Sequence, residues 1–362
     1  MGRRGEVRKG RGAVGNPEGR FETQRLVEAD YGWASGDEED APPRLPTTVT
    51  PEQTRTILSR NDSPDISFDR SINPYKGCEH GCVYCFARPT HSYLGLSPGL
   101  DFETKIVSKP EAARLLREEL RRPGYRCEVI ALGANTDPYQ PVERELKITR
   151  SILEVLKEHR HPVGIVTKGS LVLRDLDLLA PMAVMRLATV MISITTLDRD
   201  LARRMEPRAA SPERRLATLR ALNEAGVPTG VLSSPMIPGL NDAELERILE
   251  AAASAGARTA GYVILRLPHE LQSIFGEWLE AHYPLRAAHV LNLVRETRGG
   301  KLYDSEFGLR MKGTGPYADI LRRRFETACR RLGLTGSRLE LDTTQFRVPP
   351  RAGDQPGLFD PE

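Results

Sequence analysis

The chain has 362 residues, of which 39% are hydrophobic and 28% charged, and its formal net charge is +3. This composition is typical of a soluble globular protein and excludes a polyelectrolyte that binds through its overall charge. No apolar run approaches the ~18 residues of a membrane span, and no apolar segment follows the basic amino terminus, so we expect neither a span nor a secretory signal.

Residues 1–65 are predicted to form a largely irregular arm. They are rich in Gly, Pro, Asp, Glu and Arg and show no sustained helical or strand period. Residues 36–43 have the composition of a loop or linker. Regular alternation begins near Ile66.

Three cysteines fall within eight residues: Cys78, Cys82 and Cys85, followed by the aromatic Phe86. Three thiolates are one fewer than a cubane iron–sulfur cluster normally takes from a protein. A cluster held in this way keeps one iron open, and an open metal position is a feature of catalytic sites. The spacing therefore predicts a [4Fe–4S] cluster with one free coordination position.

Two other uses of these cysteines compete with this interpretation. A zinc site takes four Cys or His ligands, so His80 or His91 would have to complete it, and the chain has no second knuckle. A disulfide is disfavoured, because the chain has five cysteines, an odd count, and no predicted secretory signal. A binding module that carries zinc or a cluster without catalysis stays open.

From residue 66 the chain alternates short apolar strands with helices, which predicts an α/β fold with a parallel sheet. About six strand–helix units are present, fewer than the eight of a closed barrel. The predicted strands are residues 129–132, 163–166, 190–194, 228–232 and 262–265, and the predicted helices are residues 149–159, 171–179, 212–225 and 242–255.

Polar residues follow these strands, at the end where barrel enzymes carry their chemistry. Asn135, Thr136 and Asp137 follow one strand, and they would also suit an Asx turn. Lys168 follows the next, where its amino group would bind a carboxylate or a phosphate, or extend into solvent. Ser193 lies at the end of a third strand.

The cysteine motif and the six units resemble the radical S-adenosylmethionine (SAM) enzymes, over roughly residues 65–295. The resemblance implies a partial (β/α)6 barrel over 66–295, with an irregular arm before it. It also implies that the open iron binds SAM, and that one electron cleaves SAM to methionine and a 5′-deoxyadenosyl radical, which abstracts hydrogen. Such a cluster needs a reductant such as flavodoxin or ferredoxin, and a reducing compartment, so we expect the cytoplasm.

The resemblance also implies roles for individual residues. The loop of Asn135, Thr136 and Asp137 matches the segment that holds the SAM amino group. The residues that match SAM ribose or carboxylate ligands are Ser193, Glu206 and Arg208, with Arg215 as an alternative to Arg208. Phe86 would pack near the adenine, and His80 and Tyr84 would cover or tune the cluster. No catalytic residue is assigned.

Within this family, residues 73–91, 135–143 and 235–242 resemble the spore photoproduct lyase-like group, often labelled DNA repair photolyase-related. Spore photoproduct lyases carry a hydrogen-donating cysteine just before the loop that corresponds to residues 135–137, where this chain has Gly133 and Ala134. Cys127 lies before the strand and is predicted to be structural. The resemblance therefore does not predict the reversal of thymine dimers.

The carboxyl-terminal region is predicted to form a small helical extension over 296–340 and a disordered tail over 341–362. Basic residues in the arm and on the helix at 321–331 suggest a nucleic acid substrate, and a protein or small molecule is the alternative. Residues 355–359, Gln-Pro-Gly-Leu-Phe, resemble the peptide by which bacterial repair proteins dock on the sliding clamp. The basic residues in question are Arg3, Arg4, Arg8, Lys9, Arg11, Arg322, Arg323, Arg324, Arg330 and Arg331.

Overall fold

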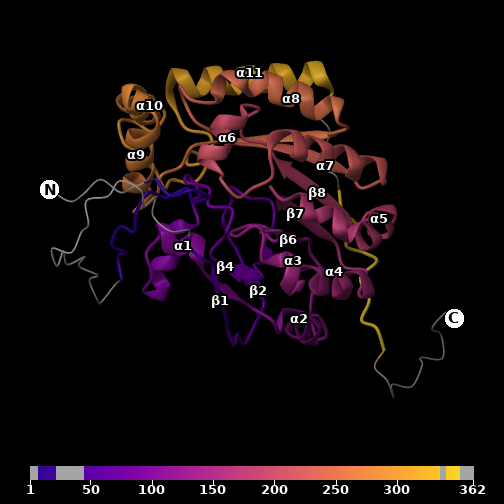
Figure 1. Cartoon of the computed structure of the whole chain (residues 1–362). Coiled ribbons are helices and arrows are strands. Elements are labelled where there is room, and N and C mark those ends of the chain that lie inside the picture. The colour runs from indigo at the N-terminus through magenta and orange to yellow at the C-terminus, as the bar shows by residue number, and fades with distance from the viewer. Residues whose placement is uncertain (1–6, 22–44, 335–339, 351–362) are drawn as a thin grey trace, which may run out of the picture.

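A computed structural model describes residues 7–21, 45–334 and 340–350 (Figure 1). Its main sheet has the order β10-β9-β8-β7-β6-β3-β2, and all neighbours are parallel except β2 and β3. Six parallel strands in sequence order confirm the partial barrel, and its edge strands β10 and β2 do not pair with each other. The strands are β2 (Leu58–Arg60), β3 (Arg70–Ile72), β6 (Ile130–Leu132), β7 (Val163–Thr167), β8 (Ala188–Ser193), β9 (Thr229–Met236) and β10 (Thr259–Ile264).

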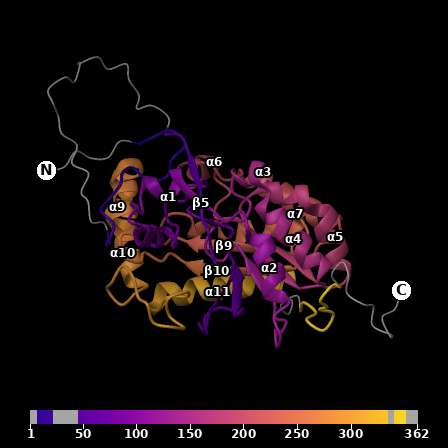
Figure 2. The same cartoon turned by 90° about the horizontal axis from the view of Figure 1, so that it is seen from below.

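Helices surround this sheet (Figures 1 and 2). Their apolar faces form the core, in which Leu153, Leu219 and Leu249 are fully buried. Among the described residues, no helix is long and apolar enough to cross a membrane. The helices are η1 (Arg88–Leu94), α1 (Leu100–Thr104), α2 (Ala112–Leu120), α3 (Glu143–Leu146), α4 (Ile148–Glu158), η2 (Ser170–Asp175), α5 (Leu176–Val184), α6 (Arg199–Met205), α7 (Pro212–Glu224), η3 (Asp242–Glu244), α8 (Leu245–Ser254), α9 (Leu271–His282), α10 (Pro284–Glu296) and α11 (Gly315–Leu332).

The helix predicted over residues 171–179 differs from the structure. Residues 170–175 form the 3₁₀ helix η2, and α5 continues to Val184 through Pro181. A proline has no N–H to donate to the carbonyl four residues earlier, and it usually ends a helix. Here Lys157 Nζ lies 3.4 Å from the carbonyl oxygen of Asp177 and supplies a donor for it.

The amino-terminal arm is less irregular than predicted. It contains β2 and also β1 (Thr48–Pro51), which pairs with β5 (Lys105–Ser108) in a small sheet that β4 (Tyr75–Lys76) completes. Both strands are short and mostly exposed, so they carry no apolar alternation that a sequence pattern would show.

The tail predicted to be disordered is ordered over residues 341–350. The ring of Phe346 packs against Tyr125 and His161, with centroids 5.4 and 5.5 Å apart, and Arg347 N donates to the carbonyl of His159 at 3.0 Å. This segment is held by the Phe346 ring and by hydrogen bonds such as that from Gln345 Nε2 to the carbonyl of Met185 at 2.8 Å. It lacks a periodic pattern, which is why the sequence did not predict its order. The clamp-like peptide of residues 355–359 lies outside the described residues.

The segment after α10 spans the gap between the two edges of the partial barrel. Ile264 N, on β10, donates to the carbonyl of Met311 at 2.9 Å. Gly308 N donates to Asp65 Oδ1 at 2.6 Å, and Arg310 pairs with the same carboxylate. Asp65 belongs to the loop between β2 and β3, so this segment is joined to β10 by a backbone hydrogen bond and to the loop beside β2 through the Asp65 carboxylate.

Candidate functional site

The three predicted cluster cysteines lie on one buried loop that follows β4. Gly81 N donates to the carbonyl of Cys78 at 3.3 Å, and Cys85 N donates to that of Cys82 at 3.2 Å. Cys78 and Cys82 are 7% and 8% exposed, and Cys85 is half-buried. Val83 N donates to the carbonyl of Met205, so the loop lies against the residues that follow β8.

The environment of these thiols fits an iron–sulfur cluster. Burial raises the pKa of all three, and Lys168 and Arg215 act in the opposite direction on Cys82, as Arg88 and Lys168 do on Cys85. Nearby cations favour the thiolates that cluster iron binds. Among the described residues, no three His, Cys, Asp or Glu side chains converge on one metal ion. A cubane cluster makes no such demand, because its ligands bind different iron atoms.

Lys168 is a cation beside these cysteines. It follows β7, and its Nζ lies 5.8 Å from the centroid of the Tyr84 ring, within the cluster loop. Across the described part of the chain, no carboxylate forms an ion pair with this amino group. The structure therefore places Lys168 where an anionic ligand near the cluster loop would meet it.

Asn135, Thr136 and Asp137 form a loop after β6, as predicted, but their hydrogen bonds are made within the protein. Backbone N–H groups of Asn135 and Thr136 donate to Asn73 Oδ1 at 3.0 and 3.4 Å. The Thr136 hydroxyl donates to the carbonyl of Tyr75 at 3.0 Å. Their predicted contact with the SAM amino group stays a prediction.

Asp137 connects this loop to its neighbours. Its Oδ1 accepts from Thr167 Oγ1 at 2.7 Å and from Tyr139 N at 2.9 Å, which is the Asx turn that the sequence left open. Its Oδ2 accepts from Lys168 N at 2.7 Å and lies 3.2 Å from His80 Nδ1. Burial alone would raise the pKa of Asp137, but the His80 charge and these hydrogen bonds hold the pKa well below its usual range.

We expect Asp137→Asn to lower the free energy of unfolding by roughly 1–3 kcal/mol at pH 7, the value of hydrogen bonds to a charged group. The folded pKa lies below the unfolded value of about 3.9, so the carboxylate stabilises the fold above that pH, and this contribution disappears as the pH falls through the folded pKa. Urea unfolding of the metal-free chains should show a smaller difference in unfolding free energy between the parent and Asp137→Asn at about pH 3 than at pH 7. Asp319→Asn, at an exposed pair, is the control, and an equal loss at both pH values would contradict the assignment.

Glu206 and Ser193 are buried, and the polar groups near them are paired within the protein. The Glu206 carboxylate pairs with Arg215 and accepts from the hydroxyls of Tyr84 and Thr195, the latter at 2.7 Å. Arg215 also donates to the carbonyl of Ser193 at 3.1 Å. Glu206 therefore fixes the cluster loop to the end of β8 through Tyr84, and the predicted contacts of Glu206 and Ser193 with SAM stay predictions.

Arg208 and Phe86 both follow the cluster loop in sequence, and both are partly exposed. The Arg208 guanidinium is 2.9 Å from Glu79 Oε1, and its side chain is 34% exposed. Phe86 is 45% exposed, and the Arg266 guanidinium lies 5.1 Å from its ring centroid. Phe86 is thus an accessible aromatic ring directly after the last cluster cysteine.

Two amide side chains, Gln140 and Asn73, hold the loops of the site in place and were not predicted from the sequence. Gln140 accepts from Glu79 N at 2.9 Å and donates to the carbonyl of Gly77 at 3.2 Å, which fastens the cluster loop to the loop after β6. Asn73 holds that same loop from the other side. Loop amides follow no helical or strand period. The one signal that could have identified Asn73 and Gln140 is their place within the two segments that resemble the family.

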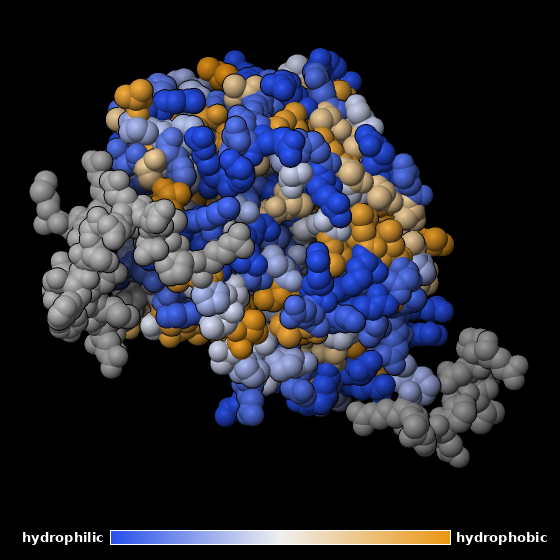
Figure 3. All heavy atoms as spheres, viewed as in Figure 1, coloured by the Kyte–Doolittle hydropathy of each residue, from blue (hydrophilic) through white to orange (hydrophobic). Residues whose placement is uncertain are grey.

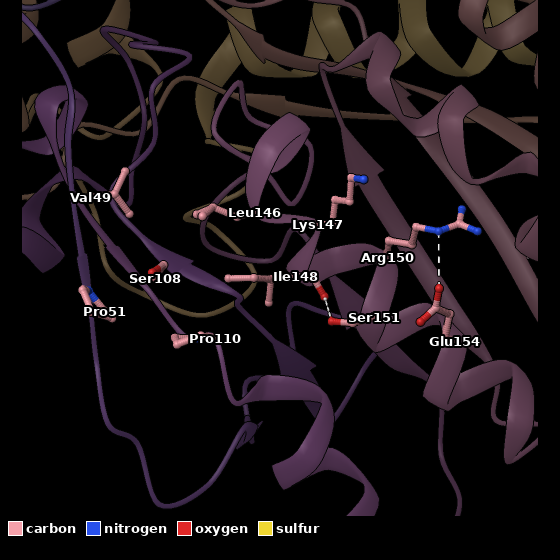
Figure 4. Close-up of a pocket in the computed structure, with 10 residues that line it drawn as sticks. All are labelled: Val49, Pro51, Ser108, Pro110, Leu146, Lys147, Ile148, Arg150, Ser151 and Glu154. Carbon is pink, nitrogen blue, oxygen red and sulfur yellow. Dashed lines mark hydrogen bonds and ion pairs between the residues drawn. The ribbon is translucent and has the colours of Figure 1, made fainter.

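The surface of the described residues has two hollows. One lies between β1, β5 and α4 and holds none of the predicted site residues (Figure 4). The other is beside α6 and the start of α7 and includes Glu206 in its lining. Apolar residues on the face shown in Figure 3 gather in small groups, so this face presents no single broad apolar patch.

The chain is similar to a known protein family and to proteins of other organisms. The family model of the Radical SAM superfamily matches residues 72–252, which include the three cysteines. An uncharacterised protein of Mycobacterium tuberculosis is 39% identical over 232 residues, 64% of this chain and 68% of the relative. An uncharacterised protein of Methanocaldococcus jannaschii is 30% identical over 173 residues, 48% of this chain and 62% of the relative.

Among solved structures, spore photoproduct lyase complexed with dinucleoside spore photoproduct superposes with a TM-score of 0.55. The two chains are 17% identical over 78% of each. A likeness at this identity shows that the fold is shared.

Proposed function

This chain belongs to the radical SAM superfamily, and we propose that it is an enzyme that binds a [4Fe–4S] cluster through Cys78, Cys82 and Cys85 and cleaves SAM. The observation that carries the proposal is that three thiols, two buried and one half-buried, lie on one loop that is fastened to the loop after β6 and has Lys168 beside it. When bound, the cluster supplies the electron that splits SAM into methionine and a 5′-deoxyadenosyl radical.

The side chains of the protein bind SAM and hold the cluster loop in place. Lys168 binds the SAM carboxylate as a point charge. The contacts of Tyr84 with Glu206 and of His80 with Asp137 hold the cluster loop in place. Burial of the loop keeps water from the thiolates, which is one of the factors that set cluster potential.

The experiment that tests this function is anaerobic reconstitution followed by EPR of the reduced protein, with flavodoxin or dithionite as the reductant. A [4Fe–4S]⁺ signal that shifts on addition of SAM, together with 5′-deoxyadenosine, is expected. Zinc in place of iron, or a cluster whose spectrum ignores SAM, would contradict the proposal and favour the binding module.

We expect Lys168→Ala to weaken SAM binding about 10- to 100-fold, because a hydrogen bond to a charged group contributes roughly 1.5–3 kcal/mol. The SAM concentration that gives half of the EPR shift measures the effect. Lys157→Ala, on α4, is the control and should bind SAM like the parent chain. An unchanged SAM affinity in Lys168→Ala would remove this lysine from the SAM site.

For the substrate we propose a nucleic acid, on the support of two arginine–aromatic pairs. Arg266 lies 5.1 Å from the ring centroid of Phe86, and Arg310, whose charge is already paired with Asp65, lies 4.6 Å from that of Phe307, which is 54% exposed. Aromatic rings stack on bases, and arginines bind phosphates. Arg266 Nε is also buried without a hydrogen-bond partner among the described residues.

The arginine-rich helix α11 supports this substrate less than its sequence predicted. Arg324 forms an ion pair with Glu246 at 2.6 Å, and Arg331 pairs with Glu250, both on α8. These contacts neutralise part of the helix charge. The support for a nucleic acid therefore comes from the aromatic pairs beside the cluster loop and β10.

We expect Phe86→Ala and Arg266→Ala each to weaken binding of a single-stranded oligonucleotide at low salt. For Phe86→Ala, the binding free energy should fall by about 1–3 kcal/mol, the value of one base stacked on an aromatic ring. Fluorescence anisotropy measures the affinity, and Arg323→Ala on α11 is the control. A larger loss of oligonucleotide affinity in Arg323→Ala than in Phe86→Ala or Arg266→Ala would show that the nucleic acid binds at α11. If the parent chain binds neither DNA nor RNA at low salt, the alternative of a protein or small-molecule substrate is favoured.

A further inference from the structure

Residues 11–14 are buried although they belong to a polar arm. Residues 11–17, here called the N-terminal strap, contact both α1 and the cluster loop. Arg11, Ala13 and Val14 are 6%, 1% and 5% exposed. Leu100 N donates to the carbonyl of Gly15 at 3.2 Å, so the start of α1 is fastened to the strap.

The strap touches the cluster loop through its backbone. A Cβ atom added at Gly12 would lie 1.8 Å from the carbonyl oxygen of Gly81, which stands directly before Cys82. Real Cβ atoms do not approach so closely, so only glycine fits at this contact. A Cβ at Gly15 would meet no atom within 4 Å, and its φ is not in the left-handed region.

One buried carboxylate joins the strap to the cluster loop. Glu103 is fully buried and accepts from Gly12 N at 2.9 Å, from Ala13 N at 2.8 Å and from Arg88 at 2.5 Å. Arg88 is also fully buried and donates to the carbonyl of Cys82 at 2.8 Å. The strap is therefore connected to Cys82 through two side chains, Glu103 and Arg88.

A second connection runs through the strap arginine. Arg11 donates to the carbonyl of Glu103 at 2.9 Å and to Thr47 Oγ1 at 3.2 Å. The Thr47 hydroxyl donates to Glu79 Oε1 at 2.6 Å, and Glu79 directly follows Cys78. Both halves of the cysteine motif thus depend on contacts made by residues 11–13.

We propose that the N-terminal strap is a wall of the cluster site, which holds the cluster loop in its iron-binding shape and keeps water and oxygen from the bound cluster. Glu103 and Arg88 are its positioning residues. Solvent exposure and hydrogen bonds around the sulfurs govern a cluster's properties, and the strap packs on the carbonyl of Gly81 and supports that of Cys82 through Glu103 and Arg88. The inference rests on the proposed function, because it requires iron at the three cysteines.

The test compares Gly12→Ala with Gly15→Ala, which add the same methyl group to the same segment. After anaerobic reconstitution, we expect Gly12→Ala to retain less iron per chain and to lose its cluster absorbance in air at least about fivefold faster than the parent. Gly15→Ala should match the parent. Glu103→Gln, which keeps the side-chain volume, should change in the same direction because it leaves the Arg88 charge buried without its partner.

A measurement on the metal-free chains reports the strap itself. Arg11 is buried in the parent, so trypsin should cleave there only when the strap has left its place. Thermal unfolding of the same samples shows whether the variants fold. Faster cleavage at Arg11 with an unchanged melting temperature and faster cluster loss is the expected result.

The outcomes separate this inference from the function it rests on. If the parent chain takes up no iron, the proposed function fails and the strap loses its role with it. If the parent takes up iron, and the strap is released in Gly12→Ala without any change in iron content or oxygen lifetime, the strap proposal alone is overturned.

Discussion

Replacing Cys82 with alanine is expected to abolish both the SAM-sensitive EPR signal and the formation of 5′-deoxyadenosine. Cys82 is one of three thiols on the cluster loop, and no fourth cysteine lies near enough in sequence to take its place. Two ligands do not hold the cluster that the chemistry requires. Iron analysis, EPR and detection of the nucleoside product measure the loss in one preparation.

Cys127→Ala and Cys329→Ala are the matched controls and should keep full activity. Burial raises the pKa of Cys127 to about 12 and that of Cys329 to about 11, so both are protonated at neutral pH. Cys127 precedes β6 and lies at the amino ends of the strands, as the sequence predicted for a structural residue. Activity that survives in Cys82→Ala and disappears in Cys127→Ala would refute the assignment of the cluster ligands.

Arg215→Ala is expected to lower the free energy of unfolding by about 3–5 kcal/mol, the cost of leaving one member of a buried ion pair without its partner. The Glu206 side chain is fully buried and that of Arg215 is 2% exposed. The variant leaves the carboxylate with the hydroxyls of Tyr84 and Thr195 and no cation. Urea unfolding of the metal-free chain at neutral pH measures this loss.

Two further variants test whether the unpaired, buried charge of Glu206 causes this loss of stability. Arg199→Ala breaks an ion pair with Glu213 whose side chains are 77% and 56% exposed, so it should cost no more than about 1 kcal/mol. Adding Glu206→Gln to Arg215→Ala removes the unpaired charge and should recover part of the loss. Equal costs for Arg215→Ala and Arg199→Ala would show that water reaches Glu206.

The strands and the cysteine loop could be predicted because their signals are local. β6 to β10 are short apolar runs, and the three cysteines stand within eight residues of one another. The strap could not be predicted in this way. Arg11 and Glu103 are 92 residues apart, and a buried contact between a polar arm and a distant helix follows neither helical nor strand period.

Polar residues follow the strands in the structure, but the sequence could not predict which partners their side chains bind. Asp137 closes an Asx turn, and Glu206 neutralises Arg215, although both stand where a ligand-binding residue would stand. Turns, buried ion pairs and ligand sites use the same residue types at the same positions. Only the partners of each oxygen atom distinguish these uses, and those partners come from other parts of the chain.

The open sheet has a consequence for association between copies of the chain. Unpaired strand edges are templates on which another molecule can add strands, so an unclosed barrel carries a risk of aggregation. At the carboxyl end of the β10 edge, Ile264 N donates to the carbonyl of Met311 in the segment after α10. The other edge is β2, which has three residues and ends in the exposed Arg60. The barrel thus stays open without offering a long, flat and apolar edge for self-association.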